Sequence, residues 1–154
     1  MDGQILQLGS PDDVYSNPID LRVAEFVGSP KINILPGNVD REGRVSVLGT
    51  SLRRRVSETS KTVKIGIRPE HLQIVTSRSE NDVWPFTVTH KENMGADFYL
   101  HGEFNGSGYR GIARARPDDV GEISLGQEIL LREKPGAAMA FAETGPRIML
   151  DEAV

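Results

Sequence analysis

From residue 31 onward, apolar and polar residues alternate in short runs that Gly, Pro, Asn or Asp separate. The clearest run is 63–67, in which Val63, Ile65 and Ile67 alternate with a lysine and a glycine. A repeat of two is typical of a strand with one buried face. Many short strands at this spacing predict a mainly β fold, as a small closed or half-closed barrel or a sandwich.

The first thirty residues follow a different pattern. Residues 4–8 alternate and predict a short strand that stops at a glycine. Ser10 is a suitable helix N-cap and Pro11 a suitable first helical residue, so a short helix is expected to begin here. Pro18 ends this helix, because the residue before a proline avoids the helical region. A second short helix is predicted before Pro30, with an apolar face made of Leu21, Ala24, Phe26 and Val27.

The composition is that of a globular protein, since 38% of the 154 residues are hydrophobic and 26% are charged. A net charge of −4 argues against nucleic acid or an anionic membrane surface as the main partner. Cysteine is absent, which excludes disulfides, thiol nucleophiles and thiolate metal ligands. No apolar run approaches the roughly 20 residues of a membrane span, and no secretory signal is visible. We therefore expect a soluble, intracellular protein.

Candidate catalytic and metal-binding residues are sparse. His71, His90 and His101 lack the short spacings of zinc ligands, and His101 with Glu103 would supply only two ligands on one strand face. No Gly-x-Ser-x-Gly turn, Walker-type glycine loop or dinucleotide fingerprint occurs. The acidic group at 118–122 is typical of a solvated turn rather than of a glycosidase pair. We expect no catalytic residue, no metal site and no cofactor in this chain.

Basic residues concentrate at Arg53, Arg54 and Arg55. A barrel with a basic hairpin binds single-stranded nucleic acid when aromatic side chains provide stacking platforms beside the charges. Here the aromatic residues lie elsewhere, at 84–86 and 98–99, among alternating core positions. We therefore interpret 53–55 as a solvated hairpin tip and expect no nucleic acid partner.

The stretch 66–72, GIRPEHL, has an unusually specific order of residues. Arg68 precedes Pro69 and is therefore expected to be extended. Pro69 begins a single helical turn whose first positions hold Glu70 and His71, and the leucine that follows returns to the core. This arrangement predicts a strand-to-turn corner, with an ion pair between Arg68 and Glu70 or a contact with a partner.

Four segments, read together, resemble one known family. The matching positions in GSPDDVYSNPIDLRVAEFVGSPKINIL are Gly9, Pro11, Tyr15, Pro18, Phe26, Gly28, Ser29, Pro30, Asn33 and Leu35. GIRPEHL matches the family motif from Gly66 to Leu72. KENMGADFYL matches a hairpin motif through Glu92, Gly95, Asp97 and Leu100, and FAETGPRI matches a closing motif, with Ala142 where an aspartate is usual.

In this order, the segments resemble the C-terminal transport-associated OB (TOBE) regulatory domain in the ATP-binding subunits of carbohydrate ABC importers, of the maltose, glycerol-3-phosphate and multiple-sugar type. The resemblance implies an OB-like barrel with extra strands, preceded by two short helices. It also implies that 1–9 is a remnant strand of the upstream ATPase domain, 10–30 a helical linker and 31–154 the regulatory domain. The Walker, signature and switch motifs of that family are missing from this sequence, so ATP and magnesium would belong to the parent subunit.

The function implied by the resemblance is regulation and the tethering of a dimer. The implied partners are the chain's own ATPase domain, a second copy, the membrane-spanning permease subunits and a regulatory protein, at the cytoplasmic face of the membrane. The interface or regulatory candidates are Gly66, Arg68, Pro69, Glu70, His71, Glu92 and Gly95. Two alternatives remain open: a module that senses a sugar or an oxyanion at a dimer seam, and a single-strand nucleic-acid binder. The imported sugar, the dimerisation of the isolated domain and the role of 51–62 stay open as well.

Overall fold

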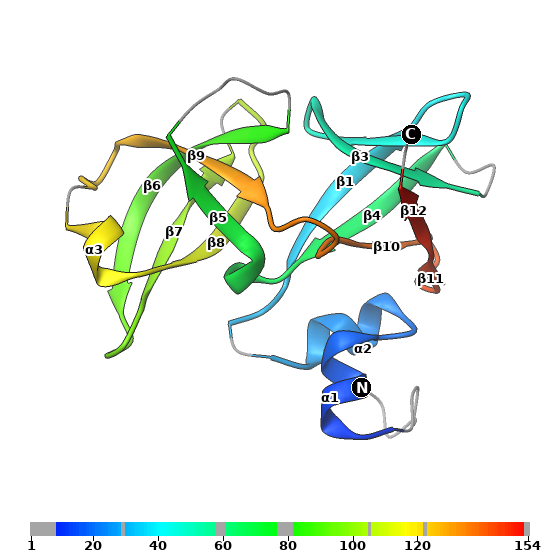
Figure 1. Cartoon of the computed structure of the whole chain (residues 1–154), viewed down its shortest axis with the longest axis horizontal. Coiled ribbons are helices and arrows are strands. Elements are labelled where there is room, and N and C mark those ends of the chain that lie inside the picture. Colours follow the sequence, from blue (N-terminus) through cyan, green and yellow to red (C-terminus); the bar gives the residue numbers. More distant parts are fainter. Residues whose placement is uncertain are drawn as a thin grey trace.

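Two antiparallel β-sheets and two short N-terminal helices make up the computed structural model of the chain, which describes residues 9–28, 30–57, 61–76, 82–104, 106–121 and 123–152 (Figure 1). The predicted mainly β fold with two short helices at the start is therefore confirmed. The strand predicted at 4–8 lies outside the described residues. Within the described part, no helix exceeds six residues, and none is long and apolar enough to cross a membrane.

The two helices are α1 (Pro11–Ser16) and α2 (Leu21–Phe26). Asp20 caps α2, because its carboxylate accepts a hydrogen bond from a backbone N–H of the first turn at 2.9 Å. The predicted apolar face of α2 is partly wrong: Val23 and Ala24 are buried, whereas Phe26 is 66% exposed. With 3.6 residues per turn, two residues that are two positions apart point to opposite sides of a helix, so Ala24 and Phe26 cannot share a buried face.

Seven strands form the first sheet, in the order β11-β10-β4-β1-β2-β3-β12. They are β1 (Asn33–Val39), β2 (Arg44–Val47), β3 (Thr50–Val56), β4 (Thr62–Ile67), β10 (Met139–Phe141), β11 (Arg147–Ile148) and β12 (Leu150–Glu152). The second sheet has the order β5-β9-β6-β7-β8. Its strands are β5 (Leu72–Val75), β6 (Val83–Asn93), β7 (Phe98–Phe104), β8 (Arg110–Ala115) and β9 (Glu128–Glu133). A 3-10 turn, η1 (Pro69–His71), joins β4 to β5 and so connects the two sheets, while α3 (Pro117–Val120) follows β8.

One hydrophobic core contains residues of both sheets, which are curved and lie side by side (Figure 1). This barrel-like, mainly β architecture is consistent with the OB-like prediction. The alternation predicted for 63–67 is observed, since Val63, Ile65 and Ile67 have no exposed surface. Trp84 of β6 donates its indole N–H to the carbonyl oxygen of Val47 in β2 at 2.9 Å, which joins the sheets directly. A smaller core cluster beneath α2 consists of Ala24, Ile32, Met139 and Phe141.

The basic residues 53–55 do not form a solvated hairpin tip. They lie within β3, and Arg54 is only 8% exposed. Its guanidinium forms an ion pair with Glu133 of β9, on the other sheet. The prediction failed because a run of charges indicates solvent exposure on average, and the sequence gives no sign of a partner 79 residues away.

Candidate functional site

The corner at 66–72 forms as its sequence predicts. Strand β4 ends at Ile67, and Arg68 is extended, with φ −65° and ψ 146°. Pro69 is the first residue of the 3-10 turn, and His71 N donates to Arg68 O at 2.9 Å. Leu72 is buried at the start of β5. This corner therefore fixes the path of the chain from one sheet to the other.

The side chain of Arg68 points back to the N-terminal helices and is 1% exposed. Its guanidinium donates to the carbonyl oxygens of Ala24 at 3.2 Å, Val27 at 2.7 Å and Tyr15 at 3.1 Å. It also stacks on the ring of Tyr15, 4.2 Å from the centroid. The last carbonyls of a helix lack partners within the helix, so a buried cation at the end of α2 satisfies them and complements the helix dipole.

The predicted ion pair between Arg68 and Glu70 is wrong. No ion pair joins these two side chains, both of which lie in the described part of the chain, because the guanidinium is directed at backbone carbonyls. Glu70 instead accepts a hydrogen bond from the hydroxyl of Tyr15. Burial and the bond to Glu70 raise the pKa of Tyr15 to about 12. Burial opposes ionisation of Glu70, but the Tyr15 hydroxyl together with backbone and neighbouring charges lowers its pKa.

Gly66 and His71 complete the corner. A β-carbon on Gly66 would lie 2.8 Å from Cδ1 of Ile32 and 3.2 Å from the ring of Phe141, so a larger residue would require these core side chains to shift, and glycine lets β4 pack closely on them. His71 is half-buried, and burial is the main cause of its lowered pKa. Its Nδ1 is buried and has no hydrogen-bond partner among the described residues. We therefore describe His71 as a neutral side chain at the edge of the corner.

A second arginine, which the sequence did not single out, holds the same helices from the closing motif. Arg147 donates from Nη1 to the carbonyl oxygen of Pro18 at 3.0 Å and from its backbone N–H to Ile19 O at 2.8 Å. Leu21 N in turn donates to Gly145 O at 2.8 Å. The sequence signal that could have revealed Arg147 is its position inside FAETGPRI, one of the motifs that resemble the family.

Ala142, which stands where the family motif has an aspartate, does not disrupt the closing turn. Its backbone N–H donates to Pro146 O at 2.8 Å, and Gly145 N donates to Ala142 O at 2.9 Å. Backbone hydrogen bonds therefore close the turn without a side chain at position 142. We call the two attachments, by Arg68 and by Arg147, the linker clamp, and the segment 10–28 that they hold the linker.

The remaining two candidates lie on the β6–β7 hairpin and do not join the linker clamp. Glu92 Oε1 lies 2.9 Å from Nε2 of His101, and Gly95, with φ +97°, donates its N–H to Asn93 Oδ1 at 2.9 Å. The hairpin reaches the corner only indirectly. Its Asp97 pairs with an arginine of β8 at 3.7 Å, and both line a cleft of about 400 Å³ together with Glu70.

No catalytic or metal centre is built from these residues. Within the described ranges, no group of three or more His, Asp or Glu side chains is placed to hold a metal ion. His101 pairs with Glu92 rather than with Glu103, whose carboxylate accepts a hydrogen bond from Gly108 N at 3.1 Å. What the linker clamp can do is mechanical, since hydrogen bonds from Arg68, which follows β4, and from Arg147 of β11 attach the linker to the first sheet.

Two family models match the chain. The model described as a TOBE domain matches residues 65–141, and the MalK OB fold domain matches residues 28–72. The chain therefore belongs to the TOBE domain family, as its motifs predicted. The corner lies where the two matches overlap.

The similar curated proteins are ATP-binding proteins for import. The chain is 34% identical over 151 residues to the sn-glycerol-3-phosphate import ATP-binding protein UgpC of Yersinia enterocolitica, an alignment that covers 92% of this chain and 40% of that protein. It is 38% identical over 102 residues to the protein of the same name in Psychromonas ingrahamii, covering 64% of this chain and 26% of that one. The chain thus spans about two fifths of the length of the Yersinia proteins.

A solved structure shares the fold. The cytoplasmic molybdate-binding protein ModG superposes with a TM-score of 0.54 over 71% of this chain and 95% of that chain. The sequence identity is 14%, so the likeness concerns the fold alone.

Proposed function

We propose that this chain is the C-terminal regulatory and dimer-tethering domain of the ATP-binding subunit of an ABC importer, with no ATPase site of its own. The observation that carries the proposal is the alignment of almost the whole chain with sn-glycerol-3-phosphate import ATP-binding proteins. Because these relatives are named for the import of sn-glycerol 3-phosphate, a phosphorylated polyol is the favoured substrate of the importer. The partners would be the chain's own ATPase domain, a second copy of the subunit, the permease subunits and a regulatory protein, at the cytoplasmic face of the membrane.

The linker clamp explains how the domain could act as a tether. A tether raises the effective concentration of the modules that it joins only when its attachment is firm. Arg68 and Arg147 bind the linker through backbone carbonyls on two sides, so the linker and the β domain move as one body. A displacement of the preceding ATPase domain would therefore reach the corner and, through it, both sheets.

A chimeric subunit tests this proposal. The aligned segment of the Yersinia enterocolitica protein is replaced by this chain, and uptake of sn-glycerol 3-phosphate, ATP affinity and subunit dimerisation are measured beside a deletion of the segment. We expect the chimera to dimerise and to restore uptake that the deletion lacks. The same chimera with Arg68→Ala should show altered dimerisation or transport coupling at unchanged ATP affinity. If ATP affinity collapses while dimerisation and coupling are unaffected, the assignment of the corner to tethering is wrong.

A further inference from the structure

The four edge strands of the two sheets differ in length. Strands β11, β12 and β5 have two, three and four residues, whereas β8 has six. An edge strand presents backbone N–H and C=O groups that no neighbouring strand pairs, and a short edge strand presents few of them. Among the described strands, β8 is therefore the edge with the greatest need for hydrogen-bond partners from outside its sheet.

The side chain of Asn33, the first residue of β1, supplies such partners at Ile112 of β8. Its Oδ1 accepts a hydrogen bond from Ile112 N at 2.7 Å, and its Nδ2 donates to Ile112 O at 2.9 Å. In an antiparallel pair of strands, a residue exchanges these same two bonds with the residue opposite it. The carboxamide of Asn33 therefore takes the place of one residue of a neighbouring strand.

The same side chain also bonds the first sheet. Nδ2 of Asn33 donates to Ile67 O, at the end of β4, at 2.9 Å. Asn33 is 5% exposed, and both of its donor hydrogens and its acceptor oxygen have partners. Gly111 leaves room for this contact, because a β-carbon there would lie 2.9 Å from Asn33 Oδ1. An ionised carboxylate has no donor and a hydroxyl has one, so neither could donate to both carbonyls.

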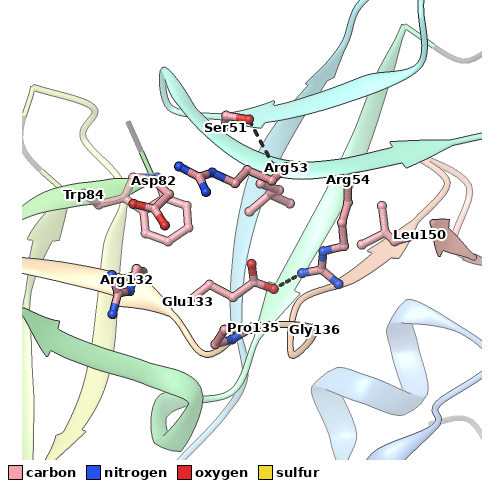
Figure 2. A pocket seen from close by; sticks show the side chains of 11 residues that line it. Ser51, Arg53, Arg54, Asp82, Trp84, Arg132, Glu133, Pro135, Gly136 and Leu150 are labelled. Carbon is pink, nitrogen blue, oxygen red and sulfur yellow. Dashed lines mark hydrogen bonds and ion pairs between the residues drawn. The ribbon is translucent and has the colours of Figure 1, made fainter. Parts of the chain in front are cut away.

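Other polar contacts between the sheets reach a different part of the second sheet. Trp84 of β6 donates to β2, and Glu133 of β9 pairs with Arg54 of β3. Figure 2 shows the side chains of Arg54 and Glu133 pointing toward each other from these two strands. Strand β9 lies next to β5, whereas β8 is the opposite edge of the five-stranded sheet. Asn33 thus ties down the edge that these contacts do not reach.

We propose that Asn33 is a latch between the sheets, which makes the β8 edge of the second sheet follow the first sheet. Its position suits this role, because the linker ends at residue 28 and β1 begins at residue 33. A displacement of the linker that shifts the start of β1 would reach β8 directly through this side chain. Release of the latch would let the β8 edge move while the contacts of β6 and β9 persist. The use of the latch in regulation rests on the proposed function, whereas the latch itself does not.

Amide hydrogen exchange of the 154-residue chain, resolved by NMR, tests the latch in the wild type. Residues two positions apart in an antiparallel ladder face the same side, so the N–H groups of Arg110 and Arg114 point to the same edge as that of Ile112. Of these three N–H groups, Asn33 bonds that of Ile112. After correction for intrinsic rates, we expect the Ile112 N–H to exchange at least about tenfold more slowly than the other two, because its bond must open first.

A pair of spin labels measures the movement between the sheets. The sequence has no cysteine, so Thr62→Cys in β4 and Tyr109→Cys beside β8 place two labels at exposed sites, one on each sheet. Asn33→Leu keeps a similar side-chain volume but removes all three hydrogen bonds. We expect this variant to show a broader distribution of label distances, and an Ile112 N–H that exchanges as fast as that of Arg110.

The matched control is Asn38→Leu, the same substitution at an exposed asparagine of the same strand. It should leave the exchange of the Ile112 N–H and the label distances as in the wild type. Two results would overturn the latch: an Ile112 N–H that exchanges in the wild type as fast as that of Arg110, and label distances distributed as narrowly in Asn33→Leu as in Asn38→Leu.

Circular dichroism establishes that each variant is folded. If Asn33→Leu does not fold, Asn33→Ser, which lacks the second donor, is measured with the same labels and judged by the same two results. Neither measurement involves ATP, dimerisation or transport. A negative result therefore leaves the chimera test of the proposed function intact.

Discussion

Replacing Arg68 with alanine would remove the centre of the linker clamp. The substitution deletes a side chain that is 1% exposed and donates to three backbone carbonyls. The acceptor in Ala24 is buried, whereas those in Val27 and Tyr15 are partly buried and can recover water in part. An exposed Arg68–Glu70 pair would have made this substitution nearly neutral, so the measured free energy distinguishes the two arrangements.

The magnitude follows from these contacts. A hydrogen bond to a charged group contributes about 1.5–3 kcal/mol, with the lower end for acceptors that regain water. Loss of the guanidinium stack on Tyr15 adds about 0.5 kcal/mol. Three such bonds at the lower end and the lost stack together amount to about 5 kcal/mol. We expect Arg68→Ala to lower the free energy of unfolding by about this amount, which is a large part of the roughly 5–15 kcal/mol of an ordinary domain. Arg68→Lys keeps the charge but loses the planar fork, and we expect about half of this loss.

Urea unfolding followed by the fluorescence of Trp84, the one tryptophan of the sequence, measures the effect. The matched control is Arg44→Ala, which removes an exposed ion pair with Asp40 and should unfold at nearly the urea concentration of the wild type. If Arg68→Ala unfolds at the same concentration as the Arg44 control, the buried hydrogen bonds do not hold the linker. The reasoning about the corner would then be refuted.

Four further predictions concern other parts of the chain. Gly28→Ala should destabilise by about 2 kcal/mol in the same urea assay, because φ is +95° and the new β-carbon would lie 3.0 Å from the Arg68 guanidinium; an unchanged midpoint would contradict this. Tyr15→Phe should raise the pKa of Glu70 in an NMR titration, since the carboxylate loses its hydroxyl donor. In the wild type, ionised Glu70 stabilises the fold at a pH above its unfolded pKa, and this stabilisation is lost as the pH falls through the lowered folded pKa. Glu133→Gln should lower the free energy of unfolding, measured in urea, by about 3 kcal/mol, because it leaves the buried guanidinium of Arg54 without its charge partner. A loss no larger than that of the Arg44→Ala control would contradict this. The isolated chain should not bind ATP in equilibrium dialysis at about 1 mM, since its sequence has no phosphate-binding loop; saturable binding would contradict the proposed function.

The backbone of the corner could be predicted from the sequence because its causes are local. Proline fixes its own φ and excludes helix from the residue before it, so the order of Arg68 and Pro69 determines an extended residue followed by a turn. The alternation of β4 and the start of α1 at Pro11 were predictable for the same reason. Each depends on residues within four positions of one another.

The partners of the buried charges could not be predicted from the sequence. Arg68 bonds carbonyls that precede it by 41 to 53 residues, and Arg54 pairs with a glutamate 79 residues later. A local argument gives Arg68 the nearest opposite charge, Glu70, and places Arg54 in solvent, and both inferences were wrong.

The linker clamp and the connection between the sheets share the corner at 66–72. The linker is attached there through main-chain carbonyls and through the side chain of Tyr15, which stacks on Arg68 and donates its hydroxyl to Glu70. The corner that makes this attachment is also the link from β4 to β5, and hence from one sheet to the other. Arg54 and Glu133 join the same two sheets by a buried ion pair. Because Arg68 stands between the linker and the chain segment that enters the second sheet, a displacement of the linker would act on the connection between the sheets without a separate path through the core.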